Sequence, residues 1–268
     1  PAMKLTEKIL KIVTNPNIAL KHIWRKVPIG SFELRSRFDA FDKPSYAYGI
    51  YRAAKLARAL GIPKISVIEF GVSKGNGLLA MEKISKKVEK ITRIKINVVG
   101  FDTGIGLTPP LDYRDMPYEW KVGEFKMDIN HLKNKLKRAR LVLGDVSQTI
   151  KKEMNNFMEA PIGFVSFDLD FYSSTKSAFK IFDGQDVMML PRVYSYFDDV
   201  YSSESDCSDF TGELLAIREF NNEHLHAKIS KCRGLTQSWN LRSSWTEGMY
   251  ILHNFNHSLY NKNVHLDS

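Results

Sequence analysis

Cysteine is scarce in this 268-residue chain, which has only Cys207 and Cys232. Two cysteines that far apart cannot form the several bridges of a small disulfide-rich protein, and their spacing is not that of a metal site. A reducing compartment is therefore expected, and we predict a cytoplasmic protein.

Long apolar runs are also missing. No stretch of the sequence approaches the roughly 18–20 apolar residues that a membrane-spanning helix needs. The first residues form a basic amphipathic pattern without the apolar core of a secretory signal. We therefore expect no membrane span.

The charge is strongly positive, with a formal net charge of +9 that would suit an anionic partner such as nucleic acid. The basic residues are nevertheless spread along predicted helix faces, where solvation explains them: Lys83, Lys86, Lys87, Lys90, Lys133, Lys135, Lys137, Arg138 and Arg140. We prefer the solvated helix faces and do not expect a nucleic-acid partner.

Strands and helices alternate through the middle of the chain. Compact apolar runs predict strands at 65–70, 95–101, 139–143, 162–167 and from near Pro191 to Phe197. Patterns of helical period separate them, from after Gly77 to about Lys90, at 128–138, at 147–159 and from Ser173 or Ser174, as the capping residue, to Phe182. Five such alternations predict an α/β fold with a doubly wound, Rossmann-like and mostly parallel sheet.

The ends of the chain add to this sheet. Residues 224–232 and 249–255 are predicted as last strands, an antiparallel pair. Residues 28–45 have no steady period and are expected to form an ordered loop, after which Ser45 caps a helix over 46–60. We assign residues 1–63 to an N-terminal helical cap or lid of the same domain, and 64–268 to the Rossmann-like domain.

Acidic residues follow two of the predicted strands. Asp168 and Asp170 come directly after one apolar run, and Asp198 and Asp199 after the next. Ligands of open α/β sheets gather beyond the carboxyl ends of the strands. Four carboxylates that meet there repel one another unless a cation or raised pKa values compensate them. We predict a divalent metal site, and the alternative is that these acids merely open loops or cap helices.

A glycine-rich turn follows the first predicted strand, with the pattern Glu69-x-Gly71-x-x-x-Gly75-x-Gly77. Glycine lets the backbone turn sharply and approach a ligand closely, and the next helix offers free N–H groups at its start. The pattern is neither G-x-G-x-x-G nor a P-loop, so it gives NAD and ATP little support. A turn that serves only packing is the alternative.

This turn, with an acid that closes the second strand, resembles the class I S-adenosylmethionine-dependent methyltransferases. The resemblance implies S-adenosylmethionine as the cofactor, with the glycine turn against its methionine and ribose parts. The ribose hydroxyls would donate hydrogen bonds to Asp102, and Asp145 would lie near the adenine. The residues so assigned to the cofactor are Glu69, Gly71, Ser73, Gly75, Asp102 and Asp145.

Residues 64–200 resemble one branch of that superfamily, the macrocin O-methyltransferases, which act on sugars in natural products. The stretches that carry this resemblance are 67–75 (VIEFGVSKG), 101–110 (FDTGIGLTPP), 143–149 (LGDVSQT), 168–175 (DLDFYSST) and 197–200 (FDDV). By this resemblance Asp168, Asp198 and Asp199 hold Mg²⁺, and Asp170 is the catalytic general base. Ser173 departs from the family's usual Glu, and Val200 from its Tyr.

The expected enzyme is a Mg²⁺-dependent methyltransferase that acts on a hydroxyl group of a sugar, a glycan or another small molecule. A cation on carboxylates lowers the pKa of a bound hydroxyl, and a further carboxylate takes its proton. The alternatives are an RNA methyltransferase, prompted by the basic charge, and a non-catalytic protein that binds the cofactor. The sequence leaves the acceptor open, and homo-oligomerisation as well.

Overall fold

A computed structural model describes residues 23–27, 29–201, 208–235, 243–264 and 266. Its centre is a seven-stranded sheet in the order β3-β2-β1-β4-β5-β7-β6. The strands are β1 (Lys64–Phe70), β2 (Lys95–Asp102), β3 (Arg140–Leu143), β4 (Ile162–Phe167), β5 (Met189–Phe197), β6 (Ala227–Lys231) and β7 (Met249–Asn254). β7 is antiparallel to both of its neighbours, and the other described pairs are parallel. The predicted doubly wound sheet with an antiparallel last pair is confirmed.

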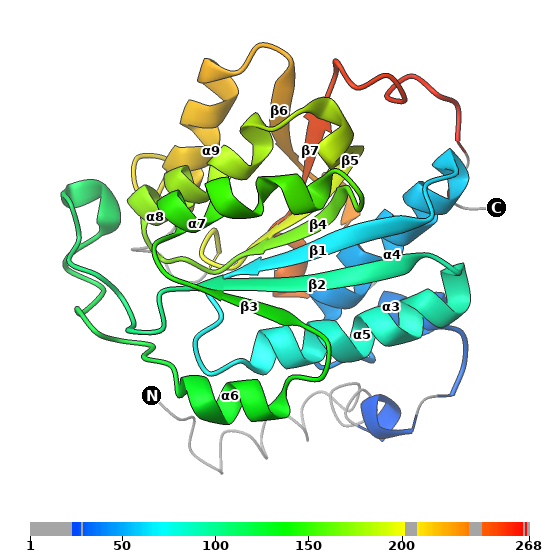
Figure 1. Ribbon diagram of the computed structural model, residues 1–268, viewed down its shortest axis with the longest axis horizontal. Coiled ribbons are helices and arrows are strands. Elements are labelled where there is room, and N and C mark those ends of the chain that lie inside the picture. Colours follow the sequence, from blue (N-terminus) through cyan, green and yellow to red (C-terminus); the bar gives the residue numbers. More distant parts are fainter. Residues whose placement is uncertain (1–22, 28, 202–207, 236–242, 265, 267–268) are drawn as a thin grey trace.

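Helices cover both faces of the sheet (Figure 1). The α-helices are α3 (Phe32–Arg37), α4 (Pro44–Leu60), α5 (Asn76–Thr92), α6 (Ile129–Lys135), α7 (Val146–Glu153), α8 (Tyr172–Ala178) and α9 (Gly212–Glu223). α4 and α5 pack on one face, and α7, α8 and α9 lie on the other. None of the helices in the described part of the chain is long and apolar enough to cross a membrane.

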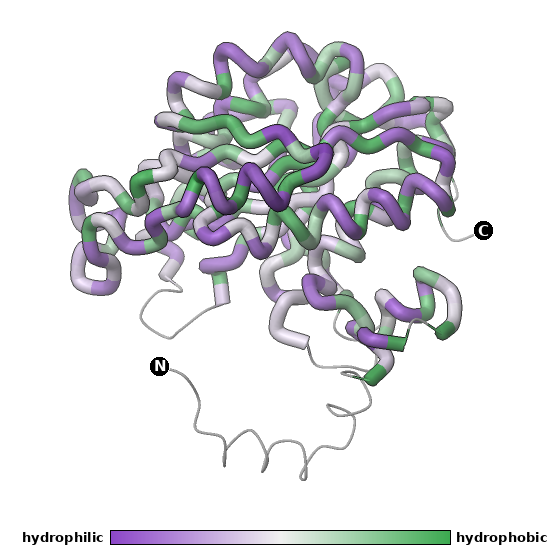
Figure 2. The backbone as a smooth tube through the Cα atoms, turned by 60° about the horizontal axis from the view of Figure 1, so that its bottom comes forward, coloured by the Kyte–Doolittle hydropathy of each residue, from purple (hydrophilic) through white to green (hydrophobic). Residues whose placement is uncertain are grey.

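The strands form two cores because their side chains alternate between the faces. Val67 belongs to the core under α4 and α5, whereas Ile68 and Phe70 belong to the core under α7 to α9. Figure 2 shows apolar residues along the central strands, while apolar and polar residues alternate along the outer helices. A central sheet that is buried on both faces follows from this pattern.

A row of phenylalanines marks the carboxyl edge of the sheet. Phe70 is in register with Phe101 and with Phe167, and Phe167 is in register with Phe197. Their rings stack at centroid distances of 4.9, 5.5 and 4.7 Å on the face of α7 to α9. An aspartate follows three of them, and alternation directs it toward the other face. The row therefore brings Asp102, Asp168 and Asp198 to the same edge.

Two local predictions are wrong. Residues 28–45 are not only a loop, because Phe32–Arg37 form α3, whose first turn is capped by the Ser31 side chain. α4 begins at Pro44, so Ser45 lies inside the helix and is buried instead of capping it. Proline suits the first turn, where its missing N–H costs nothing.

The capping residue of α8 was also mispredicted. α8 begins at Tyr172, and Phe171 occupies the N-cap position without a side-chain hydrogen bond. Ser173 therefore lies inside the helix, where its N–H and hydroxyl donate hydrogen bonds to Asp115 from a distant segment.

The N-terminal part is described from residue 23 onward. Its longest helix, α4, buries a continuous apolar stripe against the sheet, with Ile50, Ala53 and Ala54 fully buried. α4 is thus a full member of one helical layer. The cap or lid predicted for residues 1–63 stays a prediction, because residues 1–22 lie outside the described residues.

Candidate active site

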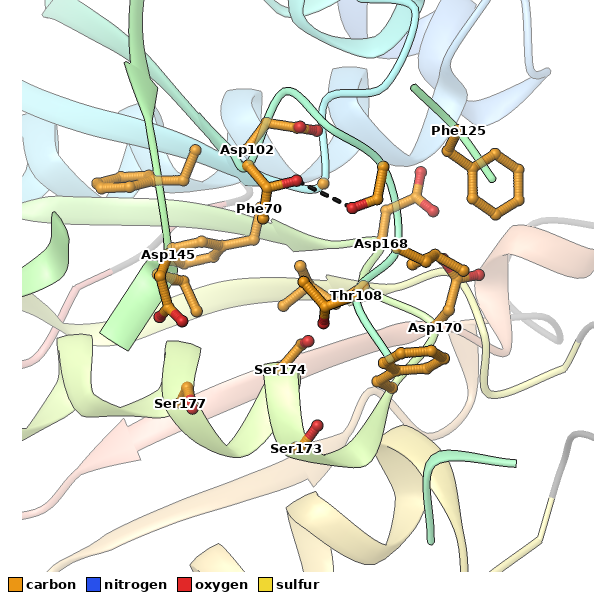
Figure 3. Close-up of a pocket in the computed structure, with 18 of the residues that line it drawn as sticks. Phe70, Asp102, Thr108, Phe125, Asp145, Asp168, Asp170, Ser173, Ser174 and Ser177 are labelled. Carbon is orange, nitrogen blue, oxygen red and sulfur yellow. Dashed lines mark hydrogen bonds between the residues drawn. The ribbon is translucent and has the colours of Figure 1, made fainter. Parts of the chain in front are cut away.

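A cavity of about 420 Å³ opens at the carboxyl ends of β1, β2 and β4 (Figure 3). This volume lies within the roughly 300–1,000 Å³ that is typical of small-molecule sites. Six predicted site residues line it: Gly71, Ser73, Asp102, Asp145, Asp168 and Asp170. The cavity lies where the strand order reverses between β1 and β4, which is the usual place for a ligand in a doubly wound sheet.

The glycine turn packs against the end of β4. Gly71 has φ +82°, and a Cβ placed on it would come 1.7 Å from the carbonyl oxygen of Asp168. Only glycine fits this position, because a side chain would collide with backbone. The turn and Asp168 are thereby held in direct contact at one wall of the cavity.

Asp102 fastens the glycine turn to the end of β2. Its Oδ2 accepts hydrogen bonds from the backbone N–H groups of Val72 and Ser73 at 2.8 and 2.9 Å. Its Oδ1 accepts from the N–H of Gly104 at 2.6 Å. Each carboxylate oxygen has two acceptor sites, so Oδ1 keeps one for a ligand hydroxyl. Asp102 therefore stabilises the turn and can still accept a hydrogen bond from a ligand.

Glu69 and Gly75 lie behind the cavity wall. Tyr46 donates a 2.6 Å hydrogen bond to Oε1 of Glu69 and accepts one from Ser166 at 3.0 Å. Burial raises the pKa of Glu69 to about 8. Gly75 is the N-cap of α5, and a Cβ there would meet the Leu132 side chain at 2.2 Å. Both residues shape the turn from outside, and a direct contact with the cofactor stays a prediction for them.

Asp145 stands at the opposite end of the cavity. It is the N-cap of α7, and its Oδ1 accepts hydrogen bonds from the backbone N–H and the hydroxyl of Ser147 at 2.7 and 2.5 Å. The residue is exposed, and its hydrogen bonds within the described part of the chain use Oδ1. Asp145 therefore caps a helix and lines the cavity as well.

Three of the four predicted acids converge beside this cavity. Asp168, Asp198 and Asp199 each offer a carboxylate oxygen, and these oxygens lie within 4.8 Å of one another. Within the described part of the chain, this group does not include Asp170, which lines the cavity (Figure 3). Of the two acids that follow β4, Asp168 is therefore the one that joins the pair that follows β5.

Neighbouring groups hold the acids in place. Tyr196 donates a hydrogen bond to Oδ1 of Asp198 at 2.7 Å. The backbone N–H of Asp170 donates to Oδ2 of Asp199 at 3.0 Å, so the ends of β4 and β5 are joined at this point. Asp170 has φ +59°, a left-handed conformation that aspartate and asparagine tolerate better than most residues.

Burial and mutual repulsion favour the protonated form of these acids. The pKa of Asp168 is raised to about 7 by burial and then by the charge of Asp198. The pKa of Asp170 is also raised to about 7, by burial and then by Asp168. The pKa of Asp199 is raised well above its usual range by burial and by Asp170. Such a cluster binds either protons or a cation.

The donor set fits a hard divalent cation. Carboxylate oxygens are the ligands that Mg²⁺ and Mn²⁺ prefer, and three of them leave other positions of an octahedron for water or substrate hydroxyls. The adjoining cavity also fits S-adenosylmethionine, since it combines a glycine turn, acids at both ends and the apolar rings of Phe70 and Phe101.

The cluster predicts how stability depends on pH. Asp168 and Asp170, with pKa values of about 7, and Glu69, with about 8, bind protons more tightly folded than unfolded. Their stabilising contribution is full below the unfolded values near 4 and is lost as the pH rises through about 7 to 8.

We therefore expect a higher melting temperature in EDTA at about pH 6 than at about pH 8.5, and a smaller difference in Mg²⁺, which replaces the protons. Thermal unfolding in both buffers measures this. A melting temperature in EDTA that is higher at the alkaline pH would contradict the burial of these acids.

The long segment between β2 and α6 forms the outer wall of the cavity and is anchored by Asp115. This carboxylate is 1% exposed. It accepts hydrogen bonds at 2.8 Å from the N–H and the hydroxyl of Ser173 on α8, and from the N–H of Leu111. Next to it, the Arg114 guanidinium lies 4.5 Å from the ring centroid of Tyr172. Asp115 thus supplies the first turn of α8 with a carboxylate from a distant segment.

Asp115→Ala is expected to lower the melting temperature by several degrees. The lost acceptor leaves the partly buried N–H of Ser173 unpaired, at a cost of about 1–3 kcal/mol. Each kcal/mol corresponds to roughly 2–4 °C in a protein of this size. Asp112→Ala, in the same segment but half-exposed and paired with Arg114, is the control and should change little. Equal effects of the two substitutions would contradict the anchor.

Sequence reasoning missed four groups that shape the site: Lys43, Asp115, Tyr196 and Glu213. Lys43 lies near enough to Asp168 to offset part of the rise in its pKa. None of the four belongs to a sequence motif. Lys43, Asp115 and Glu213 come from segments remote from the motifs in sequence, and Tyr196 lies within β5. Buried acids such as Asp115 and Glu213 carry no sequence signal of their burial beyond an apolar neighbourhood.

Comparison with known proteins identifies a solved structure with a similar fold. No protein-family model matches the sequence, and no curated protein matches it either. Among solved structures, the crystal structure of CalS11, a calicheamicin methyltransferase, matches at a TM-score of 0.54 and 19% identity, over 94% of this chain and 91% of that one. The chain has a methyltransferase fold.

Two further solved structures align less closely. The apo structure of CalS11, a TDP-rhamnose 3′-O-methyltransferase, aligns at a TM-score of 0.47 and 18% identity, over 94% of this chain and 93% of that one. The plantazolicin methyltransferase BamL, in complex with a triazolic desmethylPZN analog and SAH, aligns at a TM-score of 0.42 and 10% identity, over 83% of this chain and 90% of that one. The methyltransferase fold therefore rests on the first comparison and on the strand order.

Proposed function

We propose that the protein is an S-adenosylmethionine-dependent O-methyltransferase, which requires Mg²⁺ and acts on a hydroxyl group of a sugar, a glycan or another small molecule. One observation carries the proposal: Asp168 lies at the boundary between the cavity under the glycine turn and the three-carboxylate group. Cofactor and cation would therefore meet at the same edge. The likeness to a calicheamicin methyltransferase agrees with this assignment.

The residues divide the work of methyl transfer. Ser73 and Asp102 would orient the cofactor along the glycine turn, and Asp145 would lie at its adenine end. When bound, S-adenosylmethionine supplies a methyl group activated by its sulfonium. Asp168, Asp198 and Asp199 would hold Mg²⁺, which when bound lowers the pKa of an acceptor hydroxyl.

Asp170 would take the proton of the acceptor hydroxyl. It lines the cavity, it stands outside the three-carboxylate group, and its raised pKa of about 7 suits a general base near neutral pH. Asp170 would keep this proton on its carboxylate until the methylated product leaves, which balances the transfer of the methyl group from the cofactor's sulfur to the acceptor oxygen. Holding the two substrates in line provides a further large share of the rate.

The test is a methyl-transfer assay with labelled S-adenosylmethionine and a panel of glycosides and polyhydroxylated small molecules, with Mg²⁺ and with EDTA. We expect turnover that disappears in EDTA. Turnover on RNA instead would favour an RNA methyltransferase, and calorimetric binding of S-adenosylhomocysteine without turnover on any acceptor would favour a non-catalytic cofactor-binding protein.

A further inference from the structure

A further acid, which is not one of the predicted site residues, is buried next to the three-carboxylate group of Asp168, Asp198 and Asp199. Glu213 lies in the first turn of α9 and is 2% exposed. Its Oε2 accepts a hydrogen bond from the backbone N–H of Asp199 at 3.2 Å. Its Oε1 is buried and has no hydrogen-bond partner among the described residues, and the same holds for the nearby hydroxyl of Thr211.

Glu213 begins a chain of contacts that reaches the cavity. Glu213 binds the N–H of Asp199, and Asp199 in turn binds the N–H of Asp170. The carbonyl oxygen of Asp170 would lie 4.0 Å from a Cβ placed on Gly212, so α9 begins directly beside the acid cluster. A shift of Glu213 would therefore move Asp199 and Asp170 together.

An acid in this position is hard to explain by packing alone. A buried polar atom without a partner costs free energy, and an ionised one costs more. The start of α9 favours a negative charge by a modest amount, but three other carboxylates stand close by and oppose it. A bound cation and its water molecules would compensate the charge and offer donors to the free oxygen.

We propose that Glu213 is a positioning residue of the metal site, which fixes Asp199 through its backbone N–H and accepts a hydrogen bond from a water molecule of the bound cation through its second oxygen. This inference rests on the proposed function, because it requires that Asp168, Asp198 and Asp199 hold a divalent cation. Glu213 is not itself within the group of oxygens that lie within 4.8 Å of one another, which fits a partner beyond the direct ligands.

The test measures Mn²⁺ binding by calorimetry, and melting temperatures in EDTA, for the full chain and for Glu213→Gln. The Gln side chain still accepts the hydrogen bond from Asp199, but it lacks the charge. We expect Mn²⁺ affinity to fall about 10–100-fold, as is typical when a group behind a metal ligand is removed. In EDTA the melting temperature should stay the same or rise, because one carboxylate of a crowded cluster is gone.

Two further variants separate charge from fold. Glu213→Asp keeps the charge and is expected to bind Mn²⁺ more tightly than Glu213→Gln does. Glu223→Gln removes a half-exposed carboxylate at the far end of α9, which pairs with Lys176, and should leave Mn²⁺ affinity unchanged.

The outcomes are distinct. Unchanged Mn²⁺ affinity of Glu213→Gln overturns the inference, and so does a melting temperature that falls in EDTA or a variant that fails to fold, since both indicate a merely structural role. Failure of the unaltered protein to bind Mn²⁺ or Mg²⁺ overturns the metal site of the proposed function itself.

Discussion

Asp198→Asn is expected to lower kcat/KM for methyl transfer by roughly 10³-fold or more, while S-adenosylhomocysteine binds almost as before. The substitution removes one of three charged oxygens that lie within 4.8 Å of one another. Polarisation of a substrate oxygen by a metal ion is worth several kcal/mol, and about 1.4 kcal/mol corresponds to a factor of ten. The Asn side chain can still accept the hydrogen bond of Tyr196, so the fold should be kept.

The measurement combines steady-state kinetics with calorimetry on the same preparation. Asp209→Asn, an exposed position shortly before α9, is the control and should leave both unchanged. If Asp198→Asn lost activity and cofactor affinity to the same extent, Asp198 would stabilise the structure at the carboxyl edge of the sheet and would not bind a cation.

Asp170→Asn is expected to lower kcat by about 10²–10⁴-fold, the usual contribution of a general base. Binding of Mg²⁺ and of S-adenosylhomocysteine should persist, because the hydrogen bond to Asp199 comes from the backbone N–H of residue 170. Asparagine also tolerates the φ of +59°, so the substitution adds little strain.

The dependence of kcat on pH should distinguish Asp170→Asn from the wild-type protein. A general base works only when deprotonated, so wild-type kcat should fall as the pH drops through the pKa of Asp170. That pKa is about 7 without metal, and bound Mg²⁺ moves it lower because the cation offsets the charges of Asp168 and Asp198. Asp170→Asn should lose this acidic limb. A variant that keeps the wild-type profile with only slightly reduced kcat would show that another group is the base.

The sheet could be predicted because its strands are compact apolar runs in the sequence. The strand predicted at 162–167 has the same bounds as β4, and the antiparallel last pair followed from the apolar runs at 224–232 and 249–255. Buried parallel strands leave this signature since both of their faces are covered. α3 was missed because six residues give too few turns for a helical period to stand out.

The site was predictable where a residue directly follows a strand. Register between neighbouring strands brings Asp102, Asp168 and Asp198 to one edge, and the row of stacked phenylalanines before them fixes that register. Side-chain contacts between segments that are distant along the chain produce no such pattern in the sequence. The hydrogen bonds that Ser173 donates to Asp115 and that the N–H of Asp199 donates to Glu213 depend on how two distant segments pack together, which the local sequence pattern does not encode.

Ser173 illustrates the difference. In the sequence it stands where the macrocin-type motif usually has Glu, and it resembled a helix cap. In the structure its hydroxyl and N–H donate hydrogen bonds to Asp115, so its role depends on a segment remote in sequence.

Anomalous scattering from Mn²⁺ in crystals grown with S-adenosylhomocysteine tests the central claim most directly. We expect one strong peak among the carboxylates of Asp168, Asp198 and Asp199, together with cofactor density against Gly71 and Asp102. Cofactor density with no peak at these carboxylates, or a peak at a site remote from the cavity, would contradict it.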